Sequence, residues 1–451
     1  MNFVCNFLKT FFKGDNRSVT VKKNIVGSFV LRGVSVLVSL MLVPVTIGYV
    51  NAELYGVWLT VASVMNWINF LDLGFTHGLK NKLTESLAHE DYEKGKSLVS
   101  TTYLMLITIF IPVCIILELL IPMVNWTELL NINECYNEEV TNVMRVVIAI
   151  ACLQMIVNVI VSVIAAFQKV ALSNSFGVIG NIISLFVILF LRNNYSPSLI
   201  ALALTLGLMP TLVTIIASFI CFSDRFKKVS PSWKYIKLGY IKDLMSLGYK
   251  FFIINIQVVV LYCSTNILIS YVSSPIEVTR YSIACQLMNV AMMAYTIITS
   301  PLWPAYTDAY ARNDYSWMIT TRNRMKKILL LSLLGCLVLV VLSKPIYTIW
   351  INDQVEVPYL MTIVVGLYVM AYCWMNLNCT LLVGMSKIHI ETIIVSIGML
   401  LHIPISIILG RLIGAYGVIT SLIVINFSYA IIMNLQVNKL LNRTAEGIWN
   451  K

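Results

Sequence analysis

The stretch IVGSFVLRGVSVLVSLMLVPVTI, residues 25–47, decides the fold. Arg32 is its only charged residue, and its length matches the roughly 20 apolar residues that an α-helix needs to cross the hydrocarbon core of a bilayer. A transmembrane β-strand shows about 10 residues of alternating polarity instead, and lipid offers no partner for unpaired backbone groups. The stretch therefore predicts a transmembrane α-helix.

The rest of the chain has the same character. Of its 451 residues, 59% are hydrophobic and 12% are charged, whereas an ordinary soluble domain has about 25% charged residues. Similar apolar runs recur along the sequence and predict an all-α membrane protein with about twelve transmembrane helices. The predicted spans are 25–47, 54–73, 99–122, 143–166, 170–191, 198–221, 245–272, 279–301, 328–350, 357–383, 390–409 and 412–435.

The positive charge of the chain sets its predicted orientation. A net charge of +11 could indicate nucleic-acid binding, but the Lys and Arg residues lie in short segments between apolar runs, so no nucleic acid partner is expected. With the N-terminus in the cytoplasm, most of the 32 Lys and Arg residues fall in inner segments, and only Arg192, Lys344 and Arg411 fall in outer loops. Because short loops rich in these residues stay inside, both termini are predicted to be cytoplasmic.

A basic segment, Asp224 to Asp243, follows the sixth predicted span and divides the chain into two halves. In each half the second span is followed by the motif A-x-x-D-Y, at 88–92 and at 311–315. Halves with an even number of spans are parallel repeats about the membrane normal, which predicts two six-helix lobes. An undivided channel or scaffold is the alternative. The predicted parts are a cytoplasmic or interfacial N-terminus at 1–23, an N-lobe at 24–222, a basic cytoplasmic linker at 223–243, a C-lobe at 244–438 and a cytoplasmic tail at 439–451.

The first span of each half carries a cation. Arg32 shares a narrow arc of its helix with Ser28, Ser35 and Ser39, at about 100° per residue. An arginine near the bilayer centre costs roughly 2.5–3.5 kcal/mol on insertion scales, so this side should face the protein interior or a wet cavity. The alternative is that Arg32 extends to the headgroups.

In the seventh span, Lys250, Gln257 and Ser264 follow at a spacing that keeps them nearly on one face. Lys250 is therefore a second candidate for the interface between the lobes. The alternative is that Lys250 extends to the cytoplasmic headgroups.

Uncharged polar residues recur inside the spans. The second span has five polar residues at steps of three, and part of this set can line a cavity or form hydrogen bonds between helices. They are Thr60, Ser63, Asn66, Asn69 and Asp72. Asn255 adds another amide in span seven. The sequence offers no catalytic or metal-binding constellation and no phosphate-binding loop of the GxxxxGK[ST] type, so no enzyme activity and no cofactor are expected.

Two stretches resemble the polysaccharide-transporter branch of the multidrug/oligosaccharidyl-lipid/polysaccharide exporter superfamily, in particular the Wzx-type O-antigen flippases. They are YVNAELYGVWLTVASVMNWINFLDLGFTHGLKNKLTE, from Tyr49 to Glu85, and SPLWPAYTDAYARND, from Ser300 to Asp314. The matching positions are Tyr55, Gly56, Trp58, Asp72, Gly74, Gly78 and Asn81 in the first, and Pro301, Trp303 and Pro304 in the second. The resemblance extends over nearly the whole chain through the two-lobed arrangement of twelve spans.

The resemblance implies a flippase of the bacterial inner membrane. Its cargo is a lipid-linked oligosaccharide on undecaprenyl diphosphate, moved to the periplasmic leaflet by alternating access for O-antigen, capsule or exopolysaccharide synthesis. A polysaccharide polymerase and chain-length machinery are the implied partners, and Na⁺ or H⁺ is a possible coupling ion. A diphosphate needs cations, and a glycan needs uncharged hydrogen-bonding groups. The predicted substrate-binding residues are Arg32, Lys250, Ser35, Ser39, Asn66, Asn69, Asp72, Asn255 and Gln257.

Two other functions stay open from the sequence. A drug or cation antiporter of the same superfamily shares the architecture, but cationic cargo favours buried carboxylates where this chain has Arg32. A membrane-embedded polysaccharide-processing enzyme should have a long outer loop or buried catalytic His and Arg residues. The longest predicted outer loop, about 124–141, contains no Lys, Arg or His.

Overall fold

A computed structural model shows a chain of helices and describes residues 16–70, 75–167, 169–244, 256, 259–299, 302–352, 354–385 and 387–450. Side chains are described for fewer positions, which exclude 16–29 and 66–70. Within these ranges there are helices and loops but no strands, which confirms the all-α prediction. The predicted interfacial segment before residue 16 lies outside the described residues.

The described residues include eight helices long and apolar enough to cross a membrane. These are Val30–Val50, Tyr92–Met123, Asn137–Ala166, Ala171–Asn194, Leu199–Ser223, Tyr359–Gly384, His389–Ile413 and Ala415–Leu441. A bent pair, α16 (Tyr315–Val341) and α17 (Ser343–Ile351), with 63° between the two helices, accounts for the predicted span 328–350. The predicted spans 54–73 and 279–301 coincide with α3 (Ala52–Phe70) and α14 (Pro275–Thr299). Of the predicted span 245–272, the apolar helix Val259–Val272 is described, and most of the residues before it lie outside the described ranges.

Several helices begin earlier than the apolar runs do. α2 (Asn16–Val50) has 35 residues, which at about 1.5 Å per residue exceeds the roughly 30 Å of a hydrocarbon core. α5 (Tyr92–Leu120) and α16 also start before their predicted spans. Hydropathy locates the lipid-crossing part, whereas the helix continues through charged residues such as Lys22 and Lys23 because lysine is a good helix former.

The chain forms two compact units, as the two-lobed prediction requires. The first contains Met1–Val50, Val64–Trp126 and Glu134–Ile256, and the second contains Asn51–Ser63, Thr127–Asn133 and Gln257–Lys451. Two short segments of the N-terminal half thus belong to the second unit.

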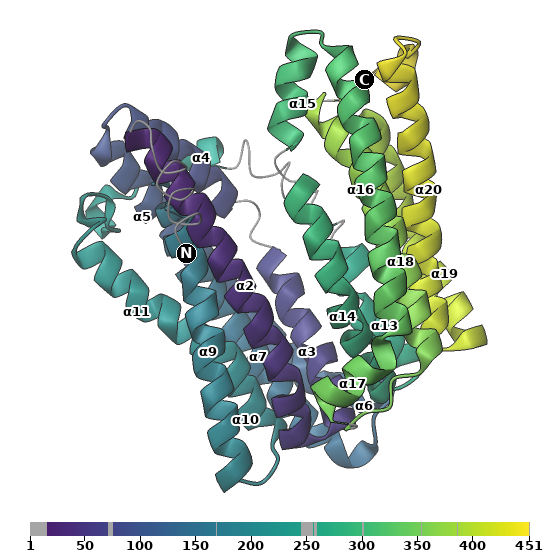
Figure 1. The fold of residues 1–451 in the computed structure, drawn as a ribbon. Coiled ribbons are helices and arrows are strands. Elements are labelled where there is room, and N and C mark those ends of the chain that lie inside the picture. The colour runs from purple at the N-terminus through teal and green to yellow at the C-terminus, as the bar shows by residue number, and fades with distance from the viewer. Residues whose placement is uncertain are drawn as a thin grey trace, which may run out of the picture. The chain divides into compact units, whose positions relative to one another are not determined.

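In the first unit, α2 packs along α9, α5 packs against α4 and α7, and α9 packs against α11 (Figure 1). Its helices are α2, α4 (Phe75–Ala88), α5, η1 (Ile121–Met123), η2 (Glu134–Tyr136), α7 (Asn137–Val157), α8 (Val159–Ala166), α9 (Val170–Asn194), α10 (Leu199–Ala203), the π-helical turn η3 (Leu204–Leu208), α11 (Met209–Ser223), η4 (Lys227–Val229) and η5 (Trp233–Tyr235).

In the second unit, α18 and α19 pack on α20, and α14, α15 and α16 pack on α18 (Figure 1). Its helices are most of α6 (Trp126–Leu130), the π-helical turn η6 (Val259–Cys263), α13 (Thr265–Val272), α14, α15 (Leu302–Ala311), α16, α17, α18 (Tyr359–Gly384), α19 (His389–Ile413), α20 (Ala415–Leu441) and η7 (Gly447–Asn450).

Close backbone contact explains why the first part of α3 belongs to the second unit. A Cβ atom on Gly56 would lie 1.8 Å from the carbonyl oxygen of Pro275, so only glycine fits. The hydroxyl of Thr279 donates a hydrogen bond to the carbonyl of Ala52 at 2.6 Å. α3 and α14 are thereby held together at backbone groups of Gly56, Pro275 and Ala52.

The repeated A-x-x-D-Y motif forms the same turn in both halves. Glu90 and Asn313 adopt left-handed φ values of 57° and 59°. The next residues, Asp91 and Asp314, cap α5 and α16 by accepting hydrogen bonds from backbone amides three residues ahead, at 2.9 and 3.0 Å. Each half therefore reaches its third long helix through an equivalent capped turn.

Candidate functional site

The polar side of α2 is also its packing side. At about 100° per residue, Arg32, Ser35 and Ser39 lie on one side of the helix, and the buried residue Thr46 continues it. The opposite side carries exposed apolar residues, namely Val30, Leu37 and Met41. Since apolar side chains suit lipid, the serine side of α2 is the one directed towards protein or water.

Arg32 itself is exposed. Among the described residues, no carboxylate lies within ion-pair distance of its guanidinium, and the described ion pairs involve Lys82, Arg145, Lys237 and Arg280. A cation in an apolar span is costly unless it meets water or an anion. Arg32 is therefore available to a negatively charged ligand.

The remaining predicted site residues are less well defined. Lys250, Asp72, Asn255 and Gln257 lie outside the described residues, and so do the side chains of Asn66 and Asn69 on α3. Ser63, on the same helix, is buried and accepts a hydrogen bond from Nδ2 of Asn266 at 3.1 Å. At this position the structure favours the packing alternative over a role in binding.

The second unit contains a group of tyrosines on facing helices. The hydroxyl of Tyr262 donates to Oδ1 of Asn426 at 3.1 Å, and its ring meets Tyr372 edge to face with 6.0 Å between centroids. Tyr368, one turn before Tyr372 on α18, lies 6.5 Å from it. This cluster presents rigid rings and hydroxyl groups, the combination that suits a polar ligand with apolar faces, such as a sugar.

Arg322 is a buried cation without a described carboxylate partner. It is 5% exposed on α16, and its Nη1 and Nη2 atoms donate to Oδ1 of Asn438 and Oδ1 of Asn434 on α20, at 2.7 and 2.6 Å. Its Nε atom and the nearby hydroxyl of Tyr306 are buried without a hydrogen-bond partner in the described structure. Neutral amides thus orient this charge without cancelling it.

The half-buried Glu277 and Glu391 of the second unit each have one buried carboxylate oxygen without a described hydrogen-bond partner, and Glu277 is paired with Arg280 through its other oxygen. Oε1 of Glu391, near the start of α19, accepts from the thiol of Cys379 at 3.0 Å, and its Oε2 atom has no described partner. Within the described residues, no group of three or more His, Cys, Asp and Glu side chains could hold a metal ion. The described groups can bind and orient a ligand through charge, hydrogen bonds and aromatic contacts.

The sequence profile of the family described as polysaccharide biosynthesis protein matches residues 21–310, which is more than half of the chain. The chain belongs to the polysaccharide biosynthesis protein family. No curated protein sequence gives a significant match. The family assignment therefore comes from the profile, and it confirms the branch that the motifs indicated.

Solved structures of transporters have the same fold as this polysaccharide biosynthesis protein. A multidrug resistance MATE family transporter of the MOP superfamily, in an inward-facing conformation, covers 91% of this chain and 95% of its own, with 12% identity and a TM-score of 0.77. A MOP superfamily transporter from Pyrococcus furiosus, described as having a binding pocket of reverse polarity, covers 97% and 98%, with 13% identity and a TM-score of 0.65. The chain therefore has the fold of these MOP superfamily transporters.

Two features of this family member were not foreseen from its sequence. Arg322 stands in the segment TTRNRMKK, residues 320–327, where every cation looked like a topology signal. Its burial depends on Asn434 and Asn438, which are distant in sequence but one helical turn apart on α20. The tyrosine cluster is the second feature, because the contact between Tyr262 and Tyr372 joins residues more than a hundred positions apart.

Proposed function

We propose that this transporter is a flippase for a lipid-linked oligosaccharide. The cargo is carried on undecaprenyl diphosphate and moves from the cytoplasmic to the periplasmic leaflet of the bacterial inner membrane by alternating access. The observation that carries the proposal is Arg32, an exposed cation on the serine side of the first span with no described carboxylate partner. The membership in a polysaccharide biosynthesis family supports the glycan as cargo.

The chemistry of this cargo fits the described groups. A diphosphate is anionic, and an arginine guanidinium binds phosphate oxygens with paired hydrogen bonds. The hydroxyls of Ser35 and Ser39 are on the same side of α2 and can accept or donate further bonds. In the second unit, Tyr262, Tyr368 and Tyr372 offer the aromatic and hydroxyl contacts that a glycan requires.

A drug or cation antiporter is the second candidate, and Glu391 is the observation that favours it. An unpaired carboxylate oxygen in a transporter lobe suits a cationic drug or a coupling ion, and multidrug transporters share the fold. The first span argues against this function because Arg32 repels cations from its polar side. The Pyrococcus furiosus transporter is described as having reverse pocket polarity, so pockets of different polarity are compatible with this architecture.

Replacement of Arg32 tests the flippase function in cells. In a strain that depends on this gene for surface polysaccharide, Arg32→Ala should abolish the surface glycan while lipid-linked repeat units accumulate, because the diphosphate loses its cation. Arg32→Lys should restore part of the glycan, since charge remains but the paired geometry is lost. Glycan staining and mass spectrometry of extracted lipids measure both effects.

Arg411→Ala is the matched control, because Arg411 is an exposed arginine at the other end of a span, in the last turn of α19. Its glycan should be normal, and all variants should be present in the membrane at equal level. Normal glycan in the Arg32→Ala strain would contradict the assignment. A loss of drug tolerance with unchanged glycan on deletion of the gene would favour the antiporter.

A further inference from the structure

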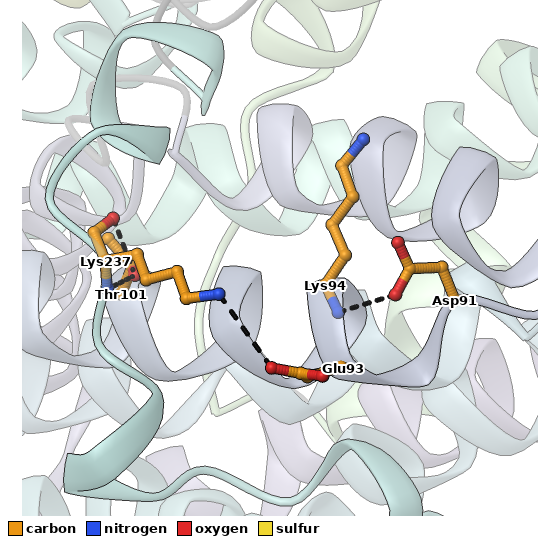
Figure 2. A network of polar contacts seen from close by, with 5 residues as sticks. All are labelled: Asp91, Glu93, Lys94, Thr101 and Lys237. Atoms are coloured by element: carbon orange, nitrogen blue, oxygen red, sulfur yellow. Dashed lines mark hydrogen bonds and ion pairs between the residues drawn. The ribbon is translucent and has the colours of Figure 1, made fainter.

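The basic segment that follows α11, residues 224–244, is attached to the first unit along α5. The backbone amide of Ser232 donates to Oγ of Ser100 at 2.9 Å. Thr101 makes two bonds with Lys237, since its hydroxyl accepts from the amide at 3.1 Å and donates to the carbonyl at 3.3 Å (Figure 2). The exposed ion pair of Lys237 with Glu93, at 3.9 Å, is weak by comparison. Hydrogen bonds between hydroxyl groups of α5 and the backbone of the segment therefore fix its middle.

Both ends of the segment are buried. Phe226 and Val229 are 1% and 0% exposed, and the ring of Phe226 lies 4.7 Å from that of Phe167. At the other end, Leu244 is fully buried against Gly78 of α4, where a Cβ atom would lie 2.1 Å from the Leu244 carbonyl oxygen. The segment is thus a fixed part of the lobe, although its composition is that of a linker.

The outer side of the segment combines large apolar side chains with positive charge. Trp233 is 77% exposed and Leu238 is 63% exposed. Six exposed cations accompany two exposed carboxylates, Asp224 and Asp243, and the cations are Arg225, Lys227, Lys228, Lys234, Lys237 and Lys242. Exposed tryptophan and leucine among lysines are typical of a segment that lies in a membrane interface.

Two apolar grooves lie on either side of Tyr103 on α5. The first has a volume of about 240 Å³ and is lined by Leu104, Ile107 and Trp233, among others. The second has a volume of about 370 Å³ and is lined mainly by residues of α11, such as Phe219. Pro231 borders both grooves, so both of them open beside the basic segment.

We propose that residues 224–244 and the two grooves bind an anionic phospholipid of the cytoplasmic leaflet. The phosphate pairs with lysines of the segment, among which Lys227 and Lys234 have no described partner, and the acyl chains occupy the grooves beside Tyr103. A phospholipid matches this arrangement, because its acyl chains suit the apolar grooves and its phosphate suits the basic segment that borders them. The proposal rests on the predicted cytoplasmic orientation and is independent of the transported cargo.

Fluorescence quenching by brominated lipids tests the proposal on the full-length protein in phosphatidylcholine nanodiscs. Brominated phosphatidylglycerol or brominated phosphatidylcholine is added at the same small mole fraction. The quenching of Trp233 is the difference in fluorescence quenching between the wild-type protein and Trp233→Phe. Brominated phosphatidylglycerol should quench Trp233 several-fold more strongly. In the double variant Lys227→Gln/Lys234→Gln the apparent affinity for this lipid should fall roughly 30-fold, because each lysine near a charged surface contributes roughly fivefold.

Arg324→Gln/Lys327→Gln removes the same charge from exposed positions on α16 and should keep the preference. Three outcomes would overturn the proposal. The two lipids quench equally, the preference for phosphatidylglycerol survives in Lys227→Gln/Lys234→Gln, or this preference is lost in the control pair. Undecaprenyl phosphate at the same mole fraction should compete no better than unbrominated phosphatidylglycerol. Stronger competition would assign the groove to the cargo lipid and would also contradict the proposal.

Discussion

At the scale of single residues, two arginines without a described carboxylate partner differ in their surroundings. Arg32 is exposed on the polar side of α2, whereas Arg322 is buried and oriented by two amide oxygens. A buried charge held by neutral groups is costly unless its hydrogen bonds are well made. Arg322 is therefore expected to matter for stability and Arg32 for binding.

Arg322→Lys should destabilise the protein. The ammonium group cannot reproduce both guanidinium bonds, and hydrogen bonds to charged groups are worth about 1.5–3 kcal/mol each. Thermal unfolding in detergent should show a lower midpoint for Arg322→Lys than for Arg324→Lys, in which the exchanged side chain is exposed. Equal midpoints would show that the bonds to Asn434 and Asn438 are dispensable.

The position of a side chain could be predicted where it depends only on the local sequence. The serine side of α2 could be derived because helical geometry alone places Arg32, Ser35 and Ser39 together. The burial of Arg322 could not, because it depends on side chains of α20 more than a hundred residues away. For Ser63 the sequence allowed two interpretations, lining of a cavity and hydrogen bonding between helices. The hydrogen bond from Asn266 favours the second.

At the scale of elements, the two A-x-x-D-Y turns show how a weak sequence repeat can mark a real structural one. Five residues with two free positions are a poor statistical match, but the shared aspartate and the backbone before it have the same structural role in both halves. The aspartate caps a helix, and the residue before it adopts a left-handed conformation. Helix boundaries were harder to derive, because hydropathy does not record how far a helix continues beyond the lipid.

Removal of either cap should weaken its helix start to a similar degree. Asp91→Ala and Asp314→Ala are each expected to cost about 0.5–2 kcal/mol, whereas Asp→Asn at the same positions should be nearly neutral, because asparagine is an equally good N-cap. Hydrogen exchange should accelerate at the amides of Lys94 and Trp317, respectively, in the alanine variants. An effect at only one of the two sites would argue against equivalent turns.

At the scale of the whole molecule, the two-lobed arrangement was predicted from the number of apolar runs and the basic segment between the halves, and the MOP superfamily from the stretches 49–85 and 300–314. The assignment of residues 51–63 to the second unit could not be predicted, because it depends on the contacts of Gly56 and Thr279 with α14. The predicted orientation of the chain rests on the distribution of Lys and Arg in its loops.

Single cysteines in a cysteine-free background test this orientation. With both termini in the cytoplasm, Asn193→Cys should react with an impermeant maleimide in cells whose outer membrane is permeabilised, because it lies at the outer end of α9. Lys242→Cys should react only after the inner membrane is opened. The reverse pattern would invert the topology and the direction of transport.

Translocation by the purified protein in liposomes tests the central claim most directly. A fluorescent oligosaccharide on undecaprenyl diphosphate is reconstituted with the protein, and its exposure to an impermeant glycosidase is followed over time. We predict rapid translocation by the wild-type protein and by Arg411→Ala, and a rate at the level of protein-free liposomes for Arg32→Ala. Translocation by Arg32→Ala at the wild-type rate, or none by the wild-type protein, would contradict the account.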